Sequence, residues 1–185
     1  LYGATKLCAE KLLVAANAYG RKSPLTLFSV VRYGNVLGSR GSIVEVIREQ
    51  KKSGAVTLTD TAMTRFLITP DKSIDLVLCA LEKMRGGEIF VPKLPAMKVA
   101  DLISALAPRA KIKVVGSRPG EKIHEDLLTQ DEVKRARDLG AYYVVTPIHD
   151  WWRGEHLRGV PSPPADFAYA SDKVRMLRKK DFLNL

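Results

Sequence analysis

The sequence has 185 residues, 46% of them hydrophobic, and a formal net charge of +10. This length and apolar content suit one domain, or one domain with a small appendage, and allow a real core. The longest apolar stretches, such as residues 76–81, are too short to span a bilayer, so no membrane segment is expected. Leu1 stands where a complete chain has Met, and a motif begins at once, which indicates a truncated chain.

Predicted helices and strands alternate along the chain. Several helix starts carry capping signals: Ser42 with Glu45, Thr69 before Pro70, and a Thr-x-x-Glu box at Thr129. In chain order we expect a helix at 2–19, a strand at 25–31, a loop at 33–41, a helix at 42–52, a strand at 55–60, a helix at 69–84, a strand at 88–91, a helix at 99–107, a strand at 111–115, a loop at 116–120, a helix at 129–138 and a strand at 141–146. This alternation predicts an α/β fold.

The positive charge allows three kinds of partner: nucleic acid, an acidic membrane surface or an anionic small molecule. Much of the excess has helical spacing, which favours solvated helix faces, and no aromatic-rich basic stripe accompanies it. The residues concerned are Lys134, Arg135, Arg137, Lys173, Arg175, Arg178, Lys179 and Lys180.

The cysteines and histidines point away from disulfide and metal chemistry. Cys8 and Cys79 fall in helical patterns with apolar neighbours, so two free, buried thiols in a reducing cytosol are expected. The three histidines have no Cys or carboxylate at metal-ligand spacing and are expected to be structural or surface residues. They are His124, His149 and His156.

Tyr2 and Lys6 form the first pattern that could carry chemistry. Residues four apart on a helix project from one face, and a nearby ammonium lowers the pKa of a tyrosine hydroxyl. Such a tyrosine can take a proton from a substrate hydroxyl. The same spacing is common on surface helices, so the pair alone leaves both interpretations open.

Polar residues in three loops could hold a phosphate. Asn35 lies in a glycine-punctuated loop after a strand, where ligands bind in α/β sheets, although a tight turn explains the same residues. Arg65 and Arg118 could each grip a phosphate through two parallel hydrogen bonds, or form surface ion pairs. The residues themselves therefore predict an α/β domain that handles an anionic ligand.

Six segments, taken in order, resemble one enzyme family over nearly the whole chain. They are YGATKLCAEKL, VVRYGNVLGSRGS, LTDTAMTRFLIT, GEIFVPKLPAMKVADL, VGSRPGEKIHEDLL and FAYASDK. They are similar to the inverting UDP-N-acetylglucosamine 4,6-dehydratases, in the polysaccharide-biosynthesis branch of the extended short-chain dehydrogenase/reductases. The tyrosine at position 2 favours a resemblance to this group within the branch, because the large membrane-anchored relatives have Met at that position. Enzymes of this family catalyse the first step of pseudaminic acid biosynthesis.

The resemblance implies an architecture. The chain would be the C-terminal portion of a doubly wound Rossmann fold with a small α/β substrate-binding lobe. Residues 1–55 and 66–85 would supply the last Rossmann elements, and residues 86–185 mostly the substrate lobe and tail. The sequence has no GxGxxG loop, so the cofactor's pyrophosphate site and the family's Asp-Lys proton-transfer pair would lie upstream.

The resemblance also implies residue roles. Tyr2 matches the active-site tyrosine, Lys6 matches the lysine on the nicotinamide ribose, and Tyr33 is expected at the cofactor. The matches to substrate-binding positions are Asn35 for the UDP diphosphate, Thr57 in the segment that lines the uracil pocket, Arg65 and Arg118 for phosphate and ribose, and Glu121 for the uridine ribose. Lys173-Val174 departs from the family, which usually has Asn in this part of the tail.

The activity implied is formation of a 4-keto-6-deoxy sugar with inversion at C5, by internal redox through NADP or NAD. We expect a UDP-sugar substrate, no nucleic-acid or membrane partner, a homo-oligomer for the full-length protein, a cytoplasmic location, and negligible turnover by this chain alone. A UDP-sugar 4-epimerase or another nucleotide-sugar dehydratase is the alternative on the same scaffold. A non-catalytic module that binds UDP-sugars or nucleic acid is the alternative from another class.

Overall fold

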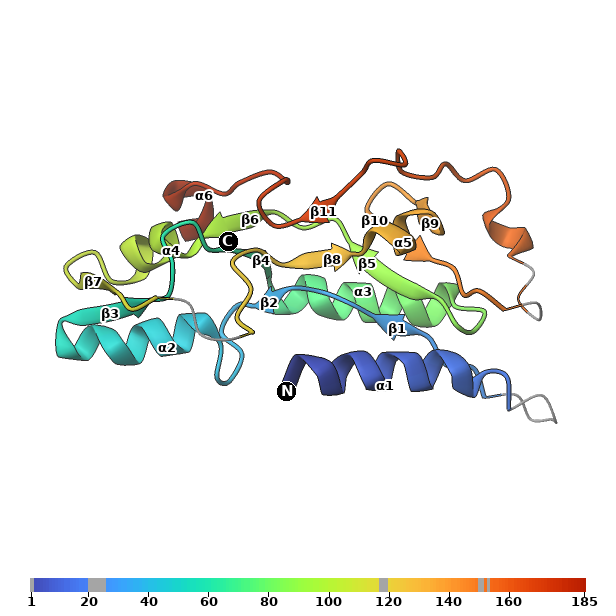
Figure 1. The fold of residues 1–185 in the computed structure, drawn as a ribbon, viewed down its shortest axis with the longest axis horizontal. Helices are drawn as coiled ribbons and strands as arrows, with labels where there is room; N and C mark the ends of the chain where they lie inside the picture. Colours follow the sequence, from blue (N-terminus) through green and yellow to red (C-terminus); the bar gives the residue numbers. More distant parts are fainter. Residues whose placement is uncertain (1, 20–25, 117–119, 150–151, 153) are drawn as a thin grey trace. The chain divides into compact units, whose positions relative to one another are not determined.

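A computed structural model of the chain describes residues 2–19, 26–116, 120–149, 152 and 154–185 (Figure 1). Helices and strands are mixed, and several strand pairs are parallel, which confirms the predicted α/β class. The chain forms two compact units. The first contains residues 1–32, 74–93 and 128–167, and the second contains residues 33–73, 94–127 and 168–185.

A four-stranded sheet is the centre of the first unit. Its strand order is β1-β5-β10-β9; β1 is parallel to β5, with Val30 opposite Ile89, and β10 is antiparallel to both of its neighbours. The strands are β1 (Val30–Val31), β5 (Ile89–Pro92), β9 (Ala136–Asp138) and β10 (Tyr142–Val145). The predicted strand at 25–31 is thus present at Val30–Val31, and its parallel partner β5 comes from the stretch after residue 86 that was expected to belong mostly to the substrate lobe.

The helices of the first unit surround a small apolar core. Leu76 and Ala80 of one helix pack with Phe90 and Val144 of the sheet and with Leu157. The helices, of which one begins in the second unit, are α1 (Tyr2–Ala16), α3 (Pro70–Lys83), α5 (Gln130–Val133) and the 3-10 turn η2 (Glu155–Leu157). Burial of this cluster, rather than intrinsic helix propensity, is the main stabilising contribution in such elements.

The capping signal at Thr129 is confirmed, but the helix predicted after it is wrong beyond Val133. Thr129 Oγ1 accepts from the Glu132 amide at 3.3 Å, and the Glu132 carboxylate accepts from the Thr129 amide at 2.9 Å. The chain then turns and forms β9, whose Arg137 lies opposite Val144 of β10. Pairing with β10 overrides the helical spacing of the charges at 134–137, so these residues are not one solvated helix face.

Three small sheets build the second unit. β3 is parallel to β7, β4 lies between β2 and β6, and β8 pairs with β11. The strands are β2 (Asn35–Val36), β3 (Ala55–Leu58), β4 (Thr64–Ile68), β6 (Ala96–Lys98), β7 (Lys111–Val114), β8 (Asp126–Leu128) and β11 (Tyr169–Ala170). The strands β2, β4, β6, β8 and β11 were not predicted. Each draws its hydrogen bonds from distant segments, which short-range sequence patterns do not reveal.

The helices of the second unit enclose its core with the C-terminal segment. They are α2 (Ile43–Gln50), the 3-10 turn η1 (Lys51–Ser53), α4 (Val99–Leu106) and α6 (Lys179–Leu183). Leu102 and Ile103 of α4 pack with Leu177 and Phe182 near the C-terminus. The Leu177 amide also donates to the Ala96 carbonyl at 2.7 Å. The C-terminal residues are thus an integral part of this unit.

Two local predictions need correction. Ser42 caps α2 by accepting from the Glu45 amide, but the Glu45 carboxylate accepts from the Gly41 amide instead of completing the box at Ser42. Both cysteines are free, yet Cys8 is exposed and Cys79 half-buried, because the face of α1 that carries Cys8 is not packed within the described chain. None of the helices in the described parts of the chain combines the length and apolar character needed to cross a bilayer.

Candidate functional site

The predicted pair of Tyr2 and Lys6 lies on one continuous helix. The backbone of α1 begins at Tyr2, and Lys6 follows one turn later with an exposed side chain. The side chain of Tyr2 lies outside the described part of the structure. The spacing that the chemistry needs is therefore provided by the helix itself.

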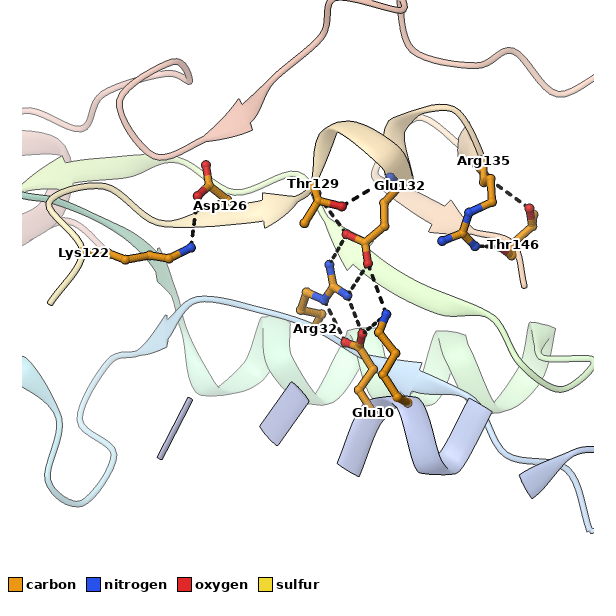
Figure 2. A network of polar contacts seen from close by, with 9 residues as sticks. Glu10, Arg32, Lys122, Asp126, Thr129, Glu132, Arg135 and Thr146 are labelled. Carbon is orange, nitrogen blue, oxygen red and sulfur yellow. Dashed lines mark hydrogen bonds and ion pairs between the residues drawn. The ribbon is translucent and has the colours of Figure 1, made fainter. Parts of the chain in front are cut away.

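An arginine between two carboxylates fixes the next turns of the same helix (Figure 2). Arg32 donates from Nε and Nη2 to Glu10 at 3.0 and 2.7 Å, and from Nη1 and Nη2 to Glu132 at 2.8 Å each. The side chains of Glu10 and Glu132 are only 8% and 6% exposed. Two buried charges of one sign are tolerated here because each forms two hydrogen bonds with one guanidinium.

The pKa values follow from these contacts. Burial lowers the pKa of Arg32, but the hydrogen bonds and charges of Glu132 and Glu10 outweigh it and raise that pKa above its ordinary value. Burial raises the pKa of Glu132, but hydrogen bonds from Arg32 and Thr129 outweigh it and lower that pKa from 4.5 to about 2. Arg32 and Glu132 are therefore both charged near neutral pH.

This network orients α1 within the first unit. Glu10 is one turn beyond Lys6 on the helix, and Arg32 directly follows β1. Glu132 adds the start of α5 through its capping box. Neither Glu10 nor Glu132 was predicted as a partner of Arg32, since 22 and 100 residues separate them from it and no local pattern links them.

A pocket of about 280 Å³ lies in the second unit. It is lined by residues 33–35, Lys122 and residues 125–127. Tyr33, expected at the cofactor, and Asn35, expected at the substrate, are thus brought to the same pocket. Gly34 is needed between them: a Cβ there would lie 2.4 Å from the Cβ of Phe66. The absent side chain lets this backbone approach β4 closely.

The Glu125 carboxylate gathers donors at this pocket. It accepts from the Asn35 amide nitrogen at 3.0 and 3.2 Å and from the Phe66 backbone N–H at 2.9 Å. Arg65 Nε lies 3.6 Å from Glu125 Oε1, the oxygen that does not accept from Phe66. The Asn35 nitrogen also donates to the Phe66 carbonyl at 3.2 Å, so protein acceptors face both of its hydrogens. Sequence reasoning did not single out Glu125.

The Arg65 guanidinium donates most of its described hydrogen bonds to backbone carbonyls. Nη1 donates to Thr64 and Ile123 at 2.8 and 3.0 Å, and Nη2 donates to Lys122 at 3.1 Å. These bonds fasten the segment 122–123 to β4, and the side chain is 14% exposed. The described contacts of Arg65 are therefore contacts that position a loop.

The other predicted substrate residues lie along the same unit. Thr57, in β3, is exposed and its hydroxyl donates to Gln50 at 3.1 Å. Glu121 is exposed and accepts from the Thr59 hydroxyl at 3.0 Å. Arg118 lies outside the described residues, so its role as a phosphate or ribose ligand stays a prediction.

The histidines have ordinary polar contacts. His124 Nδ1 lies 2.8 Å from the Thr64 hydroxyl, and His156 Nε2 lies 3.8 Å from the buried Glu88. Across the described ranges, no three His, Cys, Asp or Glu side chains gather as metal ligands.

Comparison with known proteins gives the family. Residues 1–147 match the family described as polysaccharide biosynthesis protein. The chain is 47% identical over 150 residues to the inverting UDP-N-acetylglucosamine 4,6-dehydratase of Campylobacter jejuni, covering 80% of this chain and 44% of that protein. It is 42% identical over 148 residues to the UDP-glucose 4-epimerase of Rickettsia canadensis, covering 77% of this chain and 43% of that protein.

A solved structure is also similar. The crystal structure of Pen from Bacillus thuringiensis matches 99% of this chain and 55% of its own chain, with a TM-score of 0.81 and 33% identity. The chain thus spans about half the length of the relatives it matches. From the extent of these matches, the chain belongs to the polysaccharide biosynthesis protein family, the branch of the short-chain dehydrogenase/reductases that its motifs resemble.

Proposed function

We propose that this chain is the C-terminal part of a nucleotide-sugar dehydratase, an inverting UDP-N-acetylglucosamine 4,6-dehydratase. The observation that carries the proposal is the 47% identity over 150 residues to the Campylobacter jejuni enzyme of that name. The family match over residues 1–147 contains the Tyr2–Lys6 helix and Asn35. The activity belongs to the complete protein, of which this chain spans about half. The chain alone is expected to turn over negligibly, because orienting the reactants is a large part of catalysis.

The role of α1 is to present a proton acceptor beside a positive charge. Tyr2 would take the proton of the sugar's C4 hydroxyl, and Lys6, one turn away, would favour its phenolate and bind a ribose hydroxyl. The Arg32 network keeps this helix in place while the proton moves.

The hydrogen-bond donors of α1 would suit the ribose of a nicotinamide cofactor, NADP or NAD. The exposed ammonium of Lys6 suits a ribose hydroxyl, and we also assign Tyr2 and Tyr33 to the cofactor. When bound, the cofactor would supply reversible hydride transfer. The remaining residues of its site would come from the other half of the complete protein, since these 185 residues contain no GxGxxG loop.

The second unit would hold the nucleotide sugar. Its pocket is lined by Tyr33, Asn35 and Lys122, and the proposed ligands Arg65, Thr57 and Glu121 belong to the same unit. Arg118 is proposed as a further ligand from the sequence. Lys122 and the proposed arginines would supply positive charge for a diphosphate, while the carboxylates of Glu125 and Asp126 and the amide of Asn35 suit sugar hydroxyls.

A UDP-sugar 4-epimerase is the second candidate, supported by the 42% identity to the Rickettsia canadensis epimerase. Both reactions begin by oxidation at C4, for which the same tyrosine serves. They differ afterwards: a dehydratase loses water across C5 and C6, whereas an epimerase returns the hydride to C4. Products therefore separate the two candidates.

The test uses the complete protein with UDP-N-acetylglucosamine and NADP, followed by NMR of the product. We expect a UDP-linked 4-keto-6-deoxy sugar with inverted C5 and no net reduction of the cofactor. Tyr2→Phe should lower the rate by orders of magnitude, since it removes the proton acceptor and keeps the ring. A C4 epimer with intact C6 would favour the second candidate, and a near-normal rate in Tyr2→Phe would contradict the role of the tyrosine.

A further inference from the structure

The orientation of the Asn35 side chain is fixed by its partners. Its nitrogen faces the Phe66 carbonyl at 3.2 Å and the Glu125 carboxylate at 3.0 Å. A backbone carbonyl and an ionised carboxylate can only accept hydrogen bonds. If the amide were turned over, its oxygen would face the Phe66 carbonyl and the Glu125 carboxylate, and all three groups are acceptors. The hydrogen-bond network therefore places the Asn35 nitrogen toward Phe66 and Glu125.

That orientation leaves the amide oxygen for a ligand. Asn35 lines the pocket, and its Oδ1 has no hydrogen bond to any residue that the structure describes. An amide oxygen accepts hydrogen bonds and repels the oxygens of a phosphate. Its natural partner is a hydroxyl or an N–H group of a ligand.

Glu125 is itself held from behind by the C-terminal segment. The Glu125 amide donates to Ser171 Oγ at 2.8 Å, and the Ser171 amide donates to the Glu125 carbonyl at 2.8 Å. Ser171 is fully buried, and its hydroxyl lies 2.6 Å from that of Thr64 in β4. The family match ends at residue 147, so this brace comes from a part of the chain outside it.

We propose that Glu125 is a positioning residue of the nucleotide-sugar site: braced by Ser171, its carboxylate turns the amide oxygen of Asn35 to the pocket, where it accepts a hydrogen bond from a hydroxyl or N–H of the bound UDP-sugar. This inference rests on the proposed function. It assigns Asn35 to recognition of a ligand donor in place of the contact with the diphosphate that the sequence resemblance implies.

The test compares two carboxylates of one pocket. Glu125→Gln and Asp126→Asn each remove one negative charge from its lining, but Asp126 pairs with Lys122 at 3.2 Å, and the described hydrogen bonds of Asn35 go to Phe66 and Glu125. Calorimetric titration of the complete protein with UDP and with UDP-N-acetylglucosamine gives the Kd for each variant. We expect Glu125→Gln to raise the Kd at least tenfold and Asp126→Asn to raise it clearly less. Equal losses would overturn the inference, because pocket charge alone would then explain them.

A charge-preserving exchange tests the orientation. In Asn35→Asp with Glu125→Gln, the glutamine nitrogen can donate to residue 35, and a carboxylate oxygen replaces the amide oxygen toward the ligand. We expect this double variant to recover part of the affinity that each single variant loses, which a merely structural role would not produce. The recovery stays partial because the aspartate faces the Phe66 carbonyl. No recovery would contradict acceptance from a ligand hydroxyl or N–H.

The melting temperature of each variant shows whether it is folded. A further variant, at Ser171, disturbs the Glu125 carboxylate without replacing it. Ser171→Ala removes the hydroxyl that accepts from the Glu125 amide, keeps the backbone bond to the Glu125 carbonyl and leaves the pocket lining unchanged. We expect it to weaken UDP binding in the same direction but less than Glu125→Gln. Unchanged binding in folded Ser171→Ala would remove the brace from the inference. A wild-type protein that fails to bind UDP would overturn the proposed function, and this inference with it. Binding by wild type with equal Glu125→Gln and Asp126→Asn losses would overturn this inference alone.

Discussion

Two polar networks of this chain use the same chemical groups in different ways. Around Arg32, two carboxylates that are 8% and 6% exposed enclose one guanidinium. Around Glu125, one carboxylate that is 29% exposed gathers an amide, a backbone N–H and a more distant guanidinium beside a pocket. The first network is closed and pairs charge with charge. The second leaves Asn35 Oδ1 without a described partner, which makes it suited to a ligand.

The difference shows how to separate structural from functional polar groups. A buried ion pair whose members satisfy each other holds elements in place, and breaking it leaves a charge uncompensated. A network that ends at a pocket with an unused acceptor can be altered with less loss of stability and more loss of binding. Variants in the two networks should therefore affect different measurements.

The largest expected effect is the loss of stability in Glu132→Ala. The variant removes two hydrogen bonds from Arg32 and the one from the Thr129 amide, and leaves the buried guanidinium with one carboxylate. We expect the free energy of unfolding of the complete protein to fall by about 3–5 kcal/mol, measured by urea denaturation. Asp131→Ala, next to it and 88% exposed, is the control, and it should change the free energy of unfolding far less. Equal losses would mean that the Arg32 network is not a structural centre.

An intermediate loss in the free energy of unfolding is expected for Gly34→Ala, at the point where the backbone that lines the pocket lies against β4. In Gly34→Ala the new methyl group would overlap Phe66, so β2 and β4 must separate. Such overpacking costs about 1–3 kcal/mol in the free energy of unfolding. Gly3→Ala is the matched control, because nothing lies within 4 Å of the new Cβ and the residue is helical. We expect this control to be neutral or stabilising by up to about 1 kcal/mol. A neutral Gly34→Ala would show that this close approach is not required.

The smallest expected effect is the pH dependence that Glu132 contributes. Its pKa in the folded protein is about 2, below the ordinary 4.5, so the unfolded chain takes up the proton first as pH falls. The stabilisation is complete above about pH 5 and is lost as pH falls from about 4.5 to about 2. Between about pH 4.5 and about pH 3, we expect Glu132 to account for a loss of about 1–2 kcal/mol. Urea midpoints of wild type and Glu132→Gln should converge over this window, and a constant difference would contradict the assignment.

Local chemistry made part of the fold predictable from the sequence. The cap at Thr69 and the box at Thr129 depend on residues within one turn, and both are present. The strand at Ala136–Asp138 was mistaken for helix because its charges have helical spacing, whereas its conformation is set by pairing with β10. Likewise the strand Thr64–Ile68 was not predicted, because its conformation is set by pairing with segments about 30 residues away on both sides.

The candidate site divides in the same way. Tyr2, Lys6 and Asn35 belong to short motifs and could be named from the sequence. Glu125 acts on Asn35 and on the Phe66 amide, which lie 90 and 59 residues away, so only the folded chain reveals its part. The structure also shows Arg65 on backbone carbonyls, a role that its motif does not indicate.

Hydrogen–deuterium exchange of the complete protein, with and without saturating UDP, tests most directly whether the open network binds the nucleotide and the closed one does not. Slower exchange with UDP is expected in residues 33–36, 64–68 and 121–127, which contain the pocket lining and the partners of Glu125. Residues 130–138, which contain Glu132 of the closed network, should exchange equally in both states. Unchanged exchange around Glu125, or protection confined to the residues around Glu132, would contradict this account.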